Sequence, residues 1–407
     1  MKRVVGILTL FLLNPIFAQN NIWKIYSSTN NDLVDNKTTA VLIDKNNNKW
    51  IGSQEGLTIF HGNNRQTFTT KNSKLPSNKI LCFLEEKENI WIGTAAGVLK
   101  IDGNNWEIFN NKNSGLNSNK IRKIIKNKKN LWLATEKGII KIENKNIEVF
   151  DKRKKEIKDD NFLTMAADQN NNIWAGSNSG LLKINNGKVQ TYNSKNSLLP
   201  DNHVWNIVVD KNNNIWVGTK KGLLCITDGG WMVYNKENSK LPHNAISALA
   251  ADDYDRLWIA TEEGICSFDG SEWSFYKTAK KKMKHYNIYI DKDDNKWIGT
   301  EKALLVLNQD GIEENTSKKT KQNVDFKTTN NIAKNKTKIS YFLPNTSRVS
   351  IKIFSYQGQE ITTIIEETKP KGQHHFYYNT QHLSNGTYLC QFNTDKNKKM
   401  QKIVVMK

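Results

Sequence analysis

Residues 204–234 read VWNIVVDKNNNIWVGTKKGLLCITDGGWMVY and contain four short apolar runs. The runs are 204–210, 215–219, 223–227 and 231–234, and Asn, Asp, Lys and Gly residues lie between them. Short runs of this kind joined by such turns are typical of antiparallel hairpins. The stretch therefore predicts a four-stranded antiparallel sheet.

The second run of this stretch contains Trp-Val-Gly-Thr, one of seven similar tetrapeptides in the chain. The Trp recurs every 39 to 42 residues, at Trp50, Trp91, Trp132, Trp174, Trp216, Trp258 and Trp297. Four-stranded units with a period of about 40 to 45 residues are typical of propeller blades. The repeats predict an all-β fold, a seven-bladed β-propeller, over residues 19–311.

The fourth strand of the last blade is missing from its expected place. Six units end in a fourth run, but the seventh ends at 307–311 without one. A suitable run, 22–26, precedes the first unit. We expect this N-terminal strand to complete the seventh blade and close the ring, because no unpaired edge then remains between the first and last blades.

The repeat resembles the two-component regulator propeller repeat over roughly residues 20–311. The pattern is Asn-Ser-x-Leu-Pro, an apolar strand, Asp, an Asn-rich turn, Trp-Ile-Gly-Thr and Gly-Leu, and its first part occurs at 72–76, 196–200 and 238–242. In that family such repeats often form periplasmic sensor domains of hybrid histidine kinases. No kinase segment and no spanning helix follows here, so the resemblance implies an extracellular recognition role alone.

The first 18 residues predict a signal peptide. Lys2 and Arg3 precede an apolar run at 4–13, and Ala18 provides a small residue at the expected cleavage site. The run is too short for a permanent transmembrane helix. We therefore expect a mature protein that leaves the cytoplasm and has no transmembrane segment.

The C-terminal part of the chain changes character twice. Residues 312–337 are rich in Lys, Asn, Thr and Glu and predict a flexible linker. Short alternating strands return over 338–407 and predict a small β-sandwich.

The sandwich resembles the type A C-terminal sorting domain of type IX secretion substrates in Bacteroidota. Leu343-Pro344, Gln357-Gly358, the run 383–388 and the Lys-rich last strand carry the resemblance. It implies passage across the outer membrane, with the type IX secretion machinery as a partner, and a secreted or cell-surface location. An ordinary sandwich module without a sorting role is the alternative.

The chain is strongly basic, with a formal net charge of +20. Only six of its 60 basic residues are Arg, whereas base and phosphate recognition favours the bidentate Arg side chain. We therefore expect no nucleic-acid partner. Attraction to acidic polysaccharide or lipopolysaccharide suits the charge better.

Eleven of the twelve Trp residues have a place in the repeat. Seven belong to the motif, and Trp23, Trp106, Trp231 and Trp273 belong to fourth strands. The remaining one, Trp205, lies near the start of an innermost strand. At that place in the other blades, counting along the repeat gives Thr39, Ile80, Ile121, Leu163, Ser247 and Tyr286.

An aromatic side chain near the mouth of the central channel can stack on a flat apolar ligand face. The predicted ligand site at this mouth consists of Trp205, Asn206, Arg122, Tyr286 and Asn287, and suits an acidic or glycan ligand. A core position for Trp205 and a structural salt bridge for Arg122 are the alternatives.

Three His residues, His203, His243 and His285, lie at the beginning of the first strands of blades five to seven. They could bind a divalent metal or act as acid–base groups, or be ordinary solvated side chains. Their offsets from the next Asp differ, so we assign no metal, no catalytic residue and no cofactor.

Two further patterns have a structural alternative. The Asp-Lys-Asn-Asn-Asn turns faintly resemble calcium loops, but turn chemistry alone requires these residues. Cys225 and Cys266 lie in third strands of adjacent blades and could form a cross-blade disulfide.

Taken together, these patterns predict a secreted cell-surface binding or scaffold propeller whose ligand is a glycan or a protein. A metal-dependent propeller lyase or hydrolase acting on polysaccharide is one alternative. A component of the secretion or attachment machinery is the other.

Overall fold

The computed structural model describes residues 22–308 and 325–406, apart from positions 31, 145, 155, 277–282, 330–331, 334–335, 344, 371 and 396. The chain forms two compact units, Met1–Ile312 and Glu313–Lys407. All elements of the described residues are strands, and no helix among them could span a membrane. The predicted signal peptide, 1–18, lies outside the described residues.

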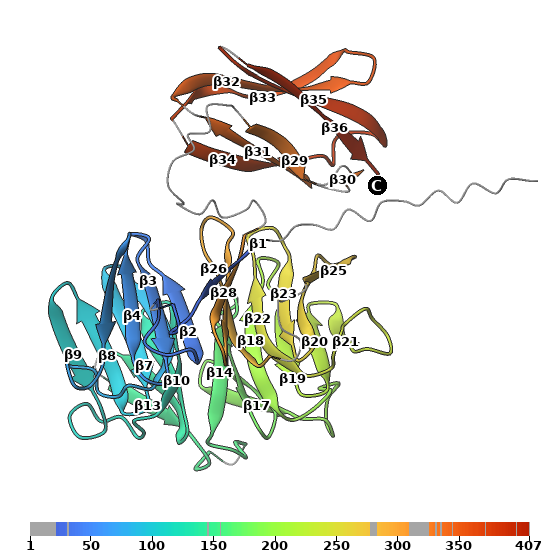
Figure 1. Ribbon diagram of the computed structural model, residues 1–407. Helices are drawn as coiled ribbons and strands as arrows, with labels where there is room; N and C mark the ends of the chain where they lie inside the picture. The colour runs from blue at the N-terminus through green and yellow to red at the C-terminus, as the bar shows by residue number, and fades with distance from the viewer. Residues whose placement is uncertain are drawn as a thin grey trace, which may run out of the picture. The chain divides into compact units, whose positions relative to one another are not determined.

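The first unit contains seven four-stranded antiparallel sheets, of which six use consecutive strands (Figure 1). Blades 1 to 3 are β2 (Thr38–Ile43), β3 (Lys49–Ser53), β4 (Leu57–His61) and β5 (Asn64–Phe68); β6 (Ile80–Glu86), β7 (Asn89–Thr94), β8 (Gly97–Asp102) and β9 (Asn105–Phe109); and β10 (Ile121–Asn127), β11 (Asn130–Thr135), β12 (Gly138–Glu143) and β13 (Asn146–Phe150). Blades 4 to 6 are β14 (Phe162–Ala167), β15 (Ile173–Ser177), β16 (Leu181–Asn185) and β17 (Lys188–Tyr192); β18 (Val204–Val209), β19 (Ile215–Thr219), β20 (Gly222–Thr227) and β21 (Gly230–Tyr234); and β22 (Ile246–Ala251), β23 (Leu257–Thr261), β24 (Gly264–Phe268) and β25 (Trp273–Tyr276).

The seventh sheet joins the two ends of the first unit. It consists of β26 (His285–Ile290), β27 (Lys296–Thr300), β28 (Leu304–Asn308) and β1 (Ile22–Tyr26), and β1 runs antiparallel to β28. The innermost strands β2, β6, β10, β14, β18, β22 and β26 contact one another in that order, and β26 also contacts β2. The all-β seven-bladed propeller is thus the observed fold.

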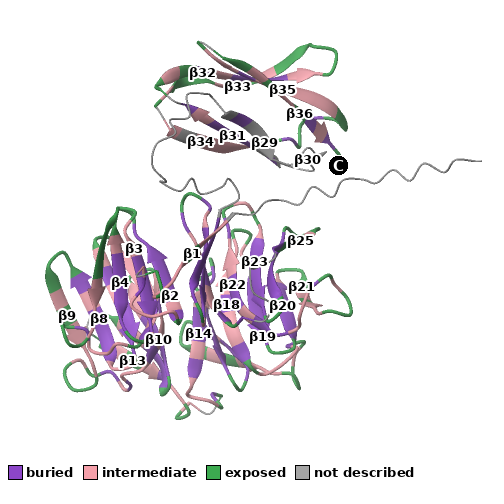
Figure 2. Ribbon diagram, viewed as in Figure 1, coloured by how far each residue is buried: buried purple, intermediate pink, exposed green. Residues whose placement is uncertain are grey.

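Burial is greatest in the motif strands of the blades and least in their outermost strands (Figure 2), whereas most positions of the innermost strands β6, β10, β18 and β26 are half-buried. The motif strands β15, β19, β23 and β27 are buried at every position. The outer strands β9 and β21 alternate between exposed and half-buried residues. Because both faces of a motif strand pack against neighbouring blades, these strands are almost continuously apolar.

The repeated Asp before each motif has a structural role. In blade 4 the Asp168 carboxylate accepts hydrogen bonds from the backbone N–H of Asn172 (2.8 Å), from its side-chain amide (2.7 Å) and from Nε1 of Trp174 (2.9 Å). Four other blades repeat the bond to Trp Nε1, through Asp44, Asp210, Asp252 and Asp291. These turns therefore use their carboxylates to hold the motif Trp, which accounts for the calcium-like pattern without a metal.

Blades 2 and 3 depart from this arrangement. In blade 2 Glu86 takes the place of the Asp and accepts from Trp91 Nε1 at 3.1 Å. In blade 3 Asn127 ends the first strand, and the buried Nε1 of Trp132 has no hydrogen-bond partner. The seven motif Trp residues are therefore equivalent in position but not in hydrogen bonding.

The second unit contains two sheets around one core. One sheet has the order β29 (Asp325–Thr329), β31 (Lys336–Leu343) and β34 (Gly372–Asn379). The other has the order β30 (Ile332–Ala333), β36 (Lys398–Val405), β35 (Gly386–Thr394), β32 (Ser347–Ser355) and β33 (Glu360–Lys369). Residues of both sheets, among them Tyr341, Ile351 and Phe392, form the core.

The predicted linker 312–337 is too long. Strands β29 and β30 lie within it, and β31 begins at Lys336. Phe326 of β29 is 2% exposed, and its ring stacks on that of Phe392 with a centroid distance of 4.9 Å. One buried aromatic residue in a polar segment produces no apolar pattern, which is why the sequence did not reveal the strand.

Candidate functional site

Each innermost strand carries a β-bulge near its start. The register with the motif strand shifts there by one residue, which leaves one residue of each blade unpaired. All seven are half-buried, and we call them the bulge ring: Thr39, Leu81, Arg122, Leu163, Trp205, Ser247 and Tyr286. Since the innermost strands form the ring, these residues lie at one end of its centre. Bulges of this kind are frequent beside binding sites.

The predicted equivalents of Trp205 in blades 2 and 3 were wrong by one residue. Ile80 and Ile121 are fully buried, and the bulge lies at Leu81 and Arg122. The reason is the turn before the motif. In blade 5 Asn206 pairs with Gly218, whereas in blade 2 Cys82 pairs with Gly93, so that turn is one residue shorter.

The structure therefore places Arg122, Trp205 and Tyr286 at one equivalent position of blades 3, 5 and 7. Arg122 Nη2 donates to Asn161 Oδ1 at 3.0 Å, and its Nε is buried without a partner. Burial lowers the pKa of this guanidinium and raises that of the Tyr286 hydroxyl. The structural salt bridge considered as the alternative for Arg122 does not occur among the described residues.

Asn206 and Asn287 occupy the next position, which pairs with the motif glycine. Asn206 is half-buried beside Trp205. Asn287 packs against its own motif strand, because a Cβ added to Gly299 would lie 2.6 Å from Asn287 Nδ2. Asn287 is half-buried, and both of its amide atoms are buried without a hydrogen-bond partner.

The three His residues take three different positions. His203 is exposed, and its Nδ1 lies 2.7 Å from Asp201 Oδ1. The Nδ1 of His243 accepts the backbone N–H of Ala245 at 3.0 Å. Among the described residues, no three His, Cys, Asp or Glu side chains form a group that could hold a metal ion.

His285 is a core residue. It is 3% exposed, its Nδ1–H donates to the Thr261 carbonyl at 3.1 Å, and its Nε2 has no partner. Burial lowers its pKa to about 4, so the ring is neutral near pH 7. The other blades place buried residues, such as Val204 and Ile246, at this position.

The four cysteines are free and buried. The disulfide considered between Cys225 and Cys266 is not formed. Burial raises the pKa of both thiols to about 12, which removes the nucleophilic thiolate near neutral pH.

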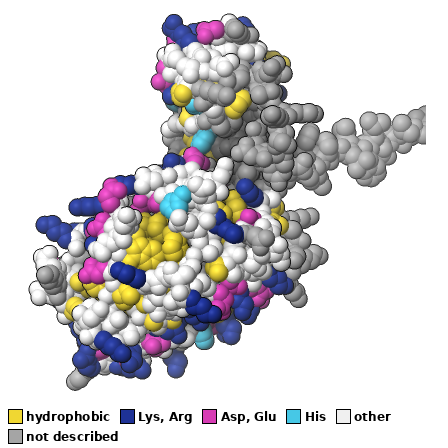
Figure 3. Space-filling model, turned by 60° about the vertical axis from the view of Figure 1, so that its left-hand side comes forward, with side chains coloured by type: hydrophobic (Ala, Val, Ile, Leu, Met, Phe, Trp, Pro, Cys, Tyr) yellow, Lys and Arg dark blue, Asp and Glu magenta, His cyan; other side chains and the backbone are white. Residues whose placement is uncertain are grey.

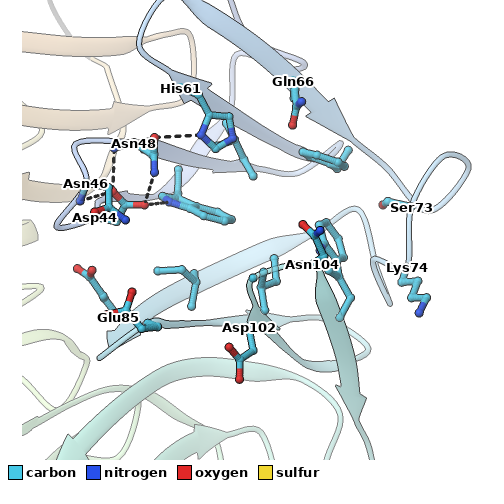
Figure 4. Close-up of a pocket in the computed structure, with 18 of the residues that line it drawn as sticks. Asp44, Asn46, Asn48, His61, Gln66, Ser73, Lys74, Glu85, Asp102 and Asn104 are labelled. Carbon is cyan, nitrogen blue, oxygen red and sulfur yellow. Dashed lines mark hydrogen bonds between the residues drawn. The ribbon is translucent and has the colours of Figure 1, made fainter.

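A groove that the sequence analysis does not predict lies between blades 1 and 2. Its volume is about 750 Å³, and it is lined by β3, β4 and β5 on one side and β7, β8 and β9 on the other (Figure 4). We call it the blade 1–2 groove. A hollow with apolar side chains is visible on this side of the propeller (Figure 3). Its apolar lining consists of Trp50, Ile59, Phe68, Ile90, Ile101 and Trp106.

Family models match both units of the chain. Residues 331–406 match the secretion system C-terminal sorting domain. Residues 198–221 and 240–263 match the two-component regulator propeller. The fold and these matches define a propeller with two-component regulator repeats, followed by a type IX sorting domain. That domain indicates export to the cell surface or the medium and implies an interaction with the type IX secretion machinery.

Solved structures share the fold at low identity. The extracellular domain of a putative hybrid two-component system from B. thetaiotaomicron has a TM-score of 0.63 at 17% identity, with 95% of this chain and 57% of that chain covered. Virginiamycin B lyase from Staphylococcus aureus has a TM-score of 0.56 at 12% identity, with coverages of 70% and 99%.

PorZ, a surface component of the type IX secretion system of Porphyromonas gingivalis, has a TM-score of 0.57 at 14% identity, with coverages of 92% and 60%. The chain thus spans 57% of the first of these structures and 60% of PorZ. No curated protein matches the sequence.

Proposed function

We propose that the protein is a secreted binding propeller that takes an anionic glycan at the channel mouth, with Arg122, Trp205 and Tyr286 as its binding residues. The observation that supports this is the composition of the bulge ring. The hydroxyls of Thr39 and Ser247 in the ring donate to backbone carbonyls. Arg122, Trp205 and Tyr286 provide a cation and two aromatic rings at the equivalent position of blades 3, 5 and 7.

The chemistry of these three residues fits an acidic sugar. The guanidinium forms charge-assisted hydrogen bonds with a carboxylate or sulfate, and an aromatic ring packs against the apolar face of a pyranose. The formal net charge of +20 favours the approach of an anionic polymer. No step of this proposal requires a metal or a cofactor.

The test is calorimetry of the full chain with anionic polysaccharide fragments found on a glycan array. Arg122→Ala should weaken binding at least tenfold, since a hydrogen bond to a charged group contributes about 1.5–3 kcal/mol. Trp205→Ala should weaken it similarly. Arg153→Ala removes the same charge from an exposed loop and should leave the affinity unchanged. Equal affinities for Arg122→Ala and the unmodified chain would refute the site.

A metal-dependent lyase or hydrolase has less support, because the three His residues make separate local contacts, with Asp201, with the backbone of Ala245 and with the Thr261 carbonyl. His203→Ala and His285→Ala, assayed on acidic polysaccharides, separate this function from binding. A role in the secretion or attachment machinery rests only on the fold shared with PorZ at 14% identity.

A further inference from the structure

The blade 1–2 groove exists because neither of its two blades places a large side chain over the motif Trp50. In blade 1 Ile59 of β4 pairs with the motif Trp50. Blades 2, 3 and 4 have Lys100, Lys141 and Lys183 at that position, paired with their own motif Trp. The ammonium groups of Lys100 and Lys183 lie 5.6 Å and 5.0 Å from the centres of those Trp rings. Blade 1 lacks this Lys, as do blades 5 to 7, which have Cys225, Ser267 and Val306 there.

The next blade does not fill the space either. At the junction of blades 5 and 6, the Phe268 ring lies 6.1 Å from that of Trp216. At the junction of blades 6 and 7, the Lys296 ammonium lies 4.5 Å from the Trp258 ring. Blade 2 contributes the shorter Ile101 and Ile90 instead. The groove therefore results from the combination of Ile59 in blade 1 with Ile90 and Ile101 in blade 2, and it is not a general property of the propeller fold.

The charges around the blade 1–2 groove nearly cancel. Four carboxylates and three lysines line it: Asp44, Glu85, Glu88 and Asp102, with Lys45, Lys74 and Lys87. The Asp44 carboxylate is occupied by Asn48 and Trp50, and Lys45 forms an ion pair with Glu88. In a chain with a net charge of +20 this lining offers no excess of positive charge to an anion. It suits an uncharged ligand.

Free polar groups flank the apolar lining on both sides. Gln66 of β5 and Asn104 between β8 and β9 project toward the groove from its two walls (Figure 4). Neither side-chain amide has a hydrogen-bond partner among the described residues. Each amide offers donors and an acceptor close together, which matches adjacent sugar hydroxyls.

We propose that the blade 1–2 groove binds a neutral oligosaccharide. The half-buried rings of Phe68 and Trp106, 5.2 Å apart, provide an apolar surface for the C–H face of a pyranose. Gln66 and Asn104 bind its hydroxyls. A volume of about 750 Å³ lies in the range of small-molecule sites. This site is separate from the channel mouth and does not rest on the function proposed above.

The groove can be filled with residues that the chain itself uses in other blades. Ile59 pairs with Gln66, and the equivalent pair in blade 3 is Lys141 with Glu148, whose charged groups lie 3.9 Å apart. The double variant Ile59→Lys/Gln66→Glu should therefore fold and place an aliphatic chain over Trp50. Lys183→Ile, the reverse change in blade 4, is the matched control.

The experiment is calorimetry of the full chain with five neutral linear trisaccharides, of glucose (α- and β-linked), mannose, xylose and N-acetylglucosamine, and with trigalacturonate as the anionic probe. At least one neutral trisaccharide should bind with one-to-one stoichiometry. The double variant should weaken that binding at least tenfold, and Lys183→Ile should leave it within twofold. Asn104→Ala, at an exposed turn, should weaken trisaccharide binding about threefold or more. This variant replaces the double variant in the test if the double variant does not fold.

Three results would overturn the proposal. The first is that none of the neutral trisaccharides binds. The second is that the double variant and Asn104→Ala both retain the full affinity. The third is that trigalacturonate binds and competes with the neutral sugar for the groove. Failure here leaves the channel-mouth proposal intact, because that one depends on an anionic ligand and on Arg122.

Discussion

Replacing Trp174 and Trp132 separately by Phe should reveal how much the Asp–Trp hydrogen bond contributes to the blade. Both Trp residues are buried, at 3% and 6% exposure, and both occupy the same place in their blades. The loss of apolar area from indole to phenyl is therefore similar and cancels in the comparison. Trp174→Phe also breaks the 2.9 Å bond to Asp168, whereas Trp132→Phe removes an N–H that has no partner.

The expected difference follows from the two polar effects. A hydrogen bond to a charged group contributes about 1.5–3 kcal/mol, and removal of an unpaired buried donor recovers about 1–3 kcal/mol. Trp174→Phe should therefore cost roughly 3 kcal/mol more free energy of unfolding than Trp132→Phe, within the ranges given for such bonds.

Urea unfolding of the full chain, followed by far-ultraviolet circular dichroism, measures the difference, because loss of a Trp does not disturb that signal as it does fluorescence. Asp168→Asn in the Trp174→Phe background should cost less than Asp168→Asn alone, as coupled residues require. If the two Trp variants differ by less than about 1 kcal/mol, the bond does not stabilise the blade as argued.

Two further predictions concern single core positions. His285 has a pKa of about 4 in the folded chain, so between pH 6.5 and 4 the unfolded chain binds a proton that the folded chain does not. The free energy of unfolding should fall by up to about 3 kcal/mol as the pH decreases over that interval. His285→Val should remove this contribution to the pH dependence, which thermal unfolding from pH 7 to 4 measures. Gly176→Ala should lower stability by about 1–3 kcal/mol, because the new Cβ would lie 2.4 Å from Val204 Cγ1. Gly229→Ala, with 3.6 Å to the nearest atom, is its control, and equal midpoints would contradict the packing argument.

The architecture was predictable because it depends on a repeated period. Seven Trp motifs at 39 to 42 residues specify seven sheets, and a sheet that lacks its outer strand requires one from elsewhere in the chain. The Asp–Trp bond could also have been inferred, since Asp precedes the motif Trp by six residues in five blades. Periodic features of this kind can be recognised in a single sequence without an alignment.

The candidate sites depend on departures from the period. One residue fewer in the turn of blades 2 and 3 moves the bulge from Ile121 to Arg122, which no count along the chain reveals. The blade 1–2 groove depends on the joint size of Ile59 and Ile101, which are 42 positions apart and lie in different sheets. The strand around Phe326 pairs with β31, and its one buried aromatic ring packs on Phe392 of the other sheet. Each of these requires knowledge of spatial neighbours.

The pairing of β1 with β28 gives the propeller an order of assembly. Every other strand pair of the propeller joins segments that are consecutive in sequence, but this pair closes a loop of roughly 280 residues. By loop-closure entropy alone, that costs about 4 kcal/mol more than a four-residue hairpin. The seventh blade is thus expected to mature last, after six blades have already stacked. If the chain of the same propeller began at another blade, the pair of strands that closes the ring would lie in that blade. Which blade forms last is therefore determined by where the chain begins and not by the seven-bladed architecture.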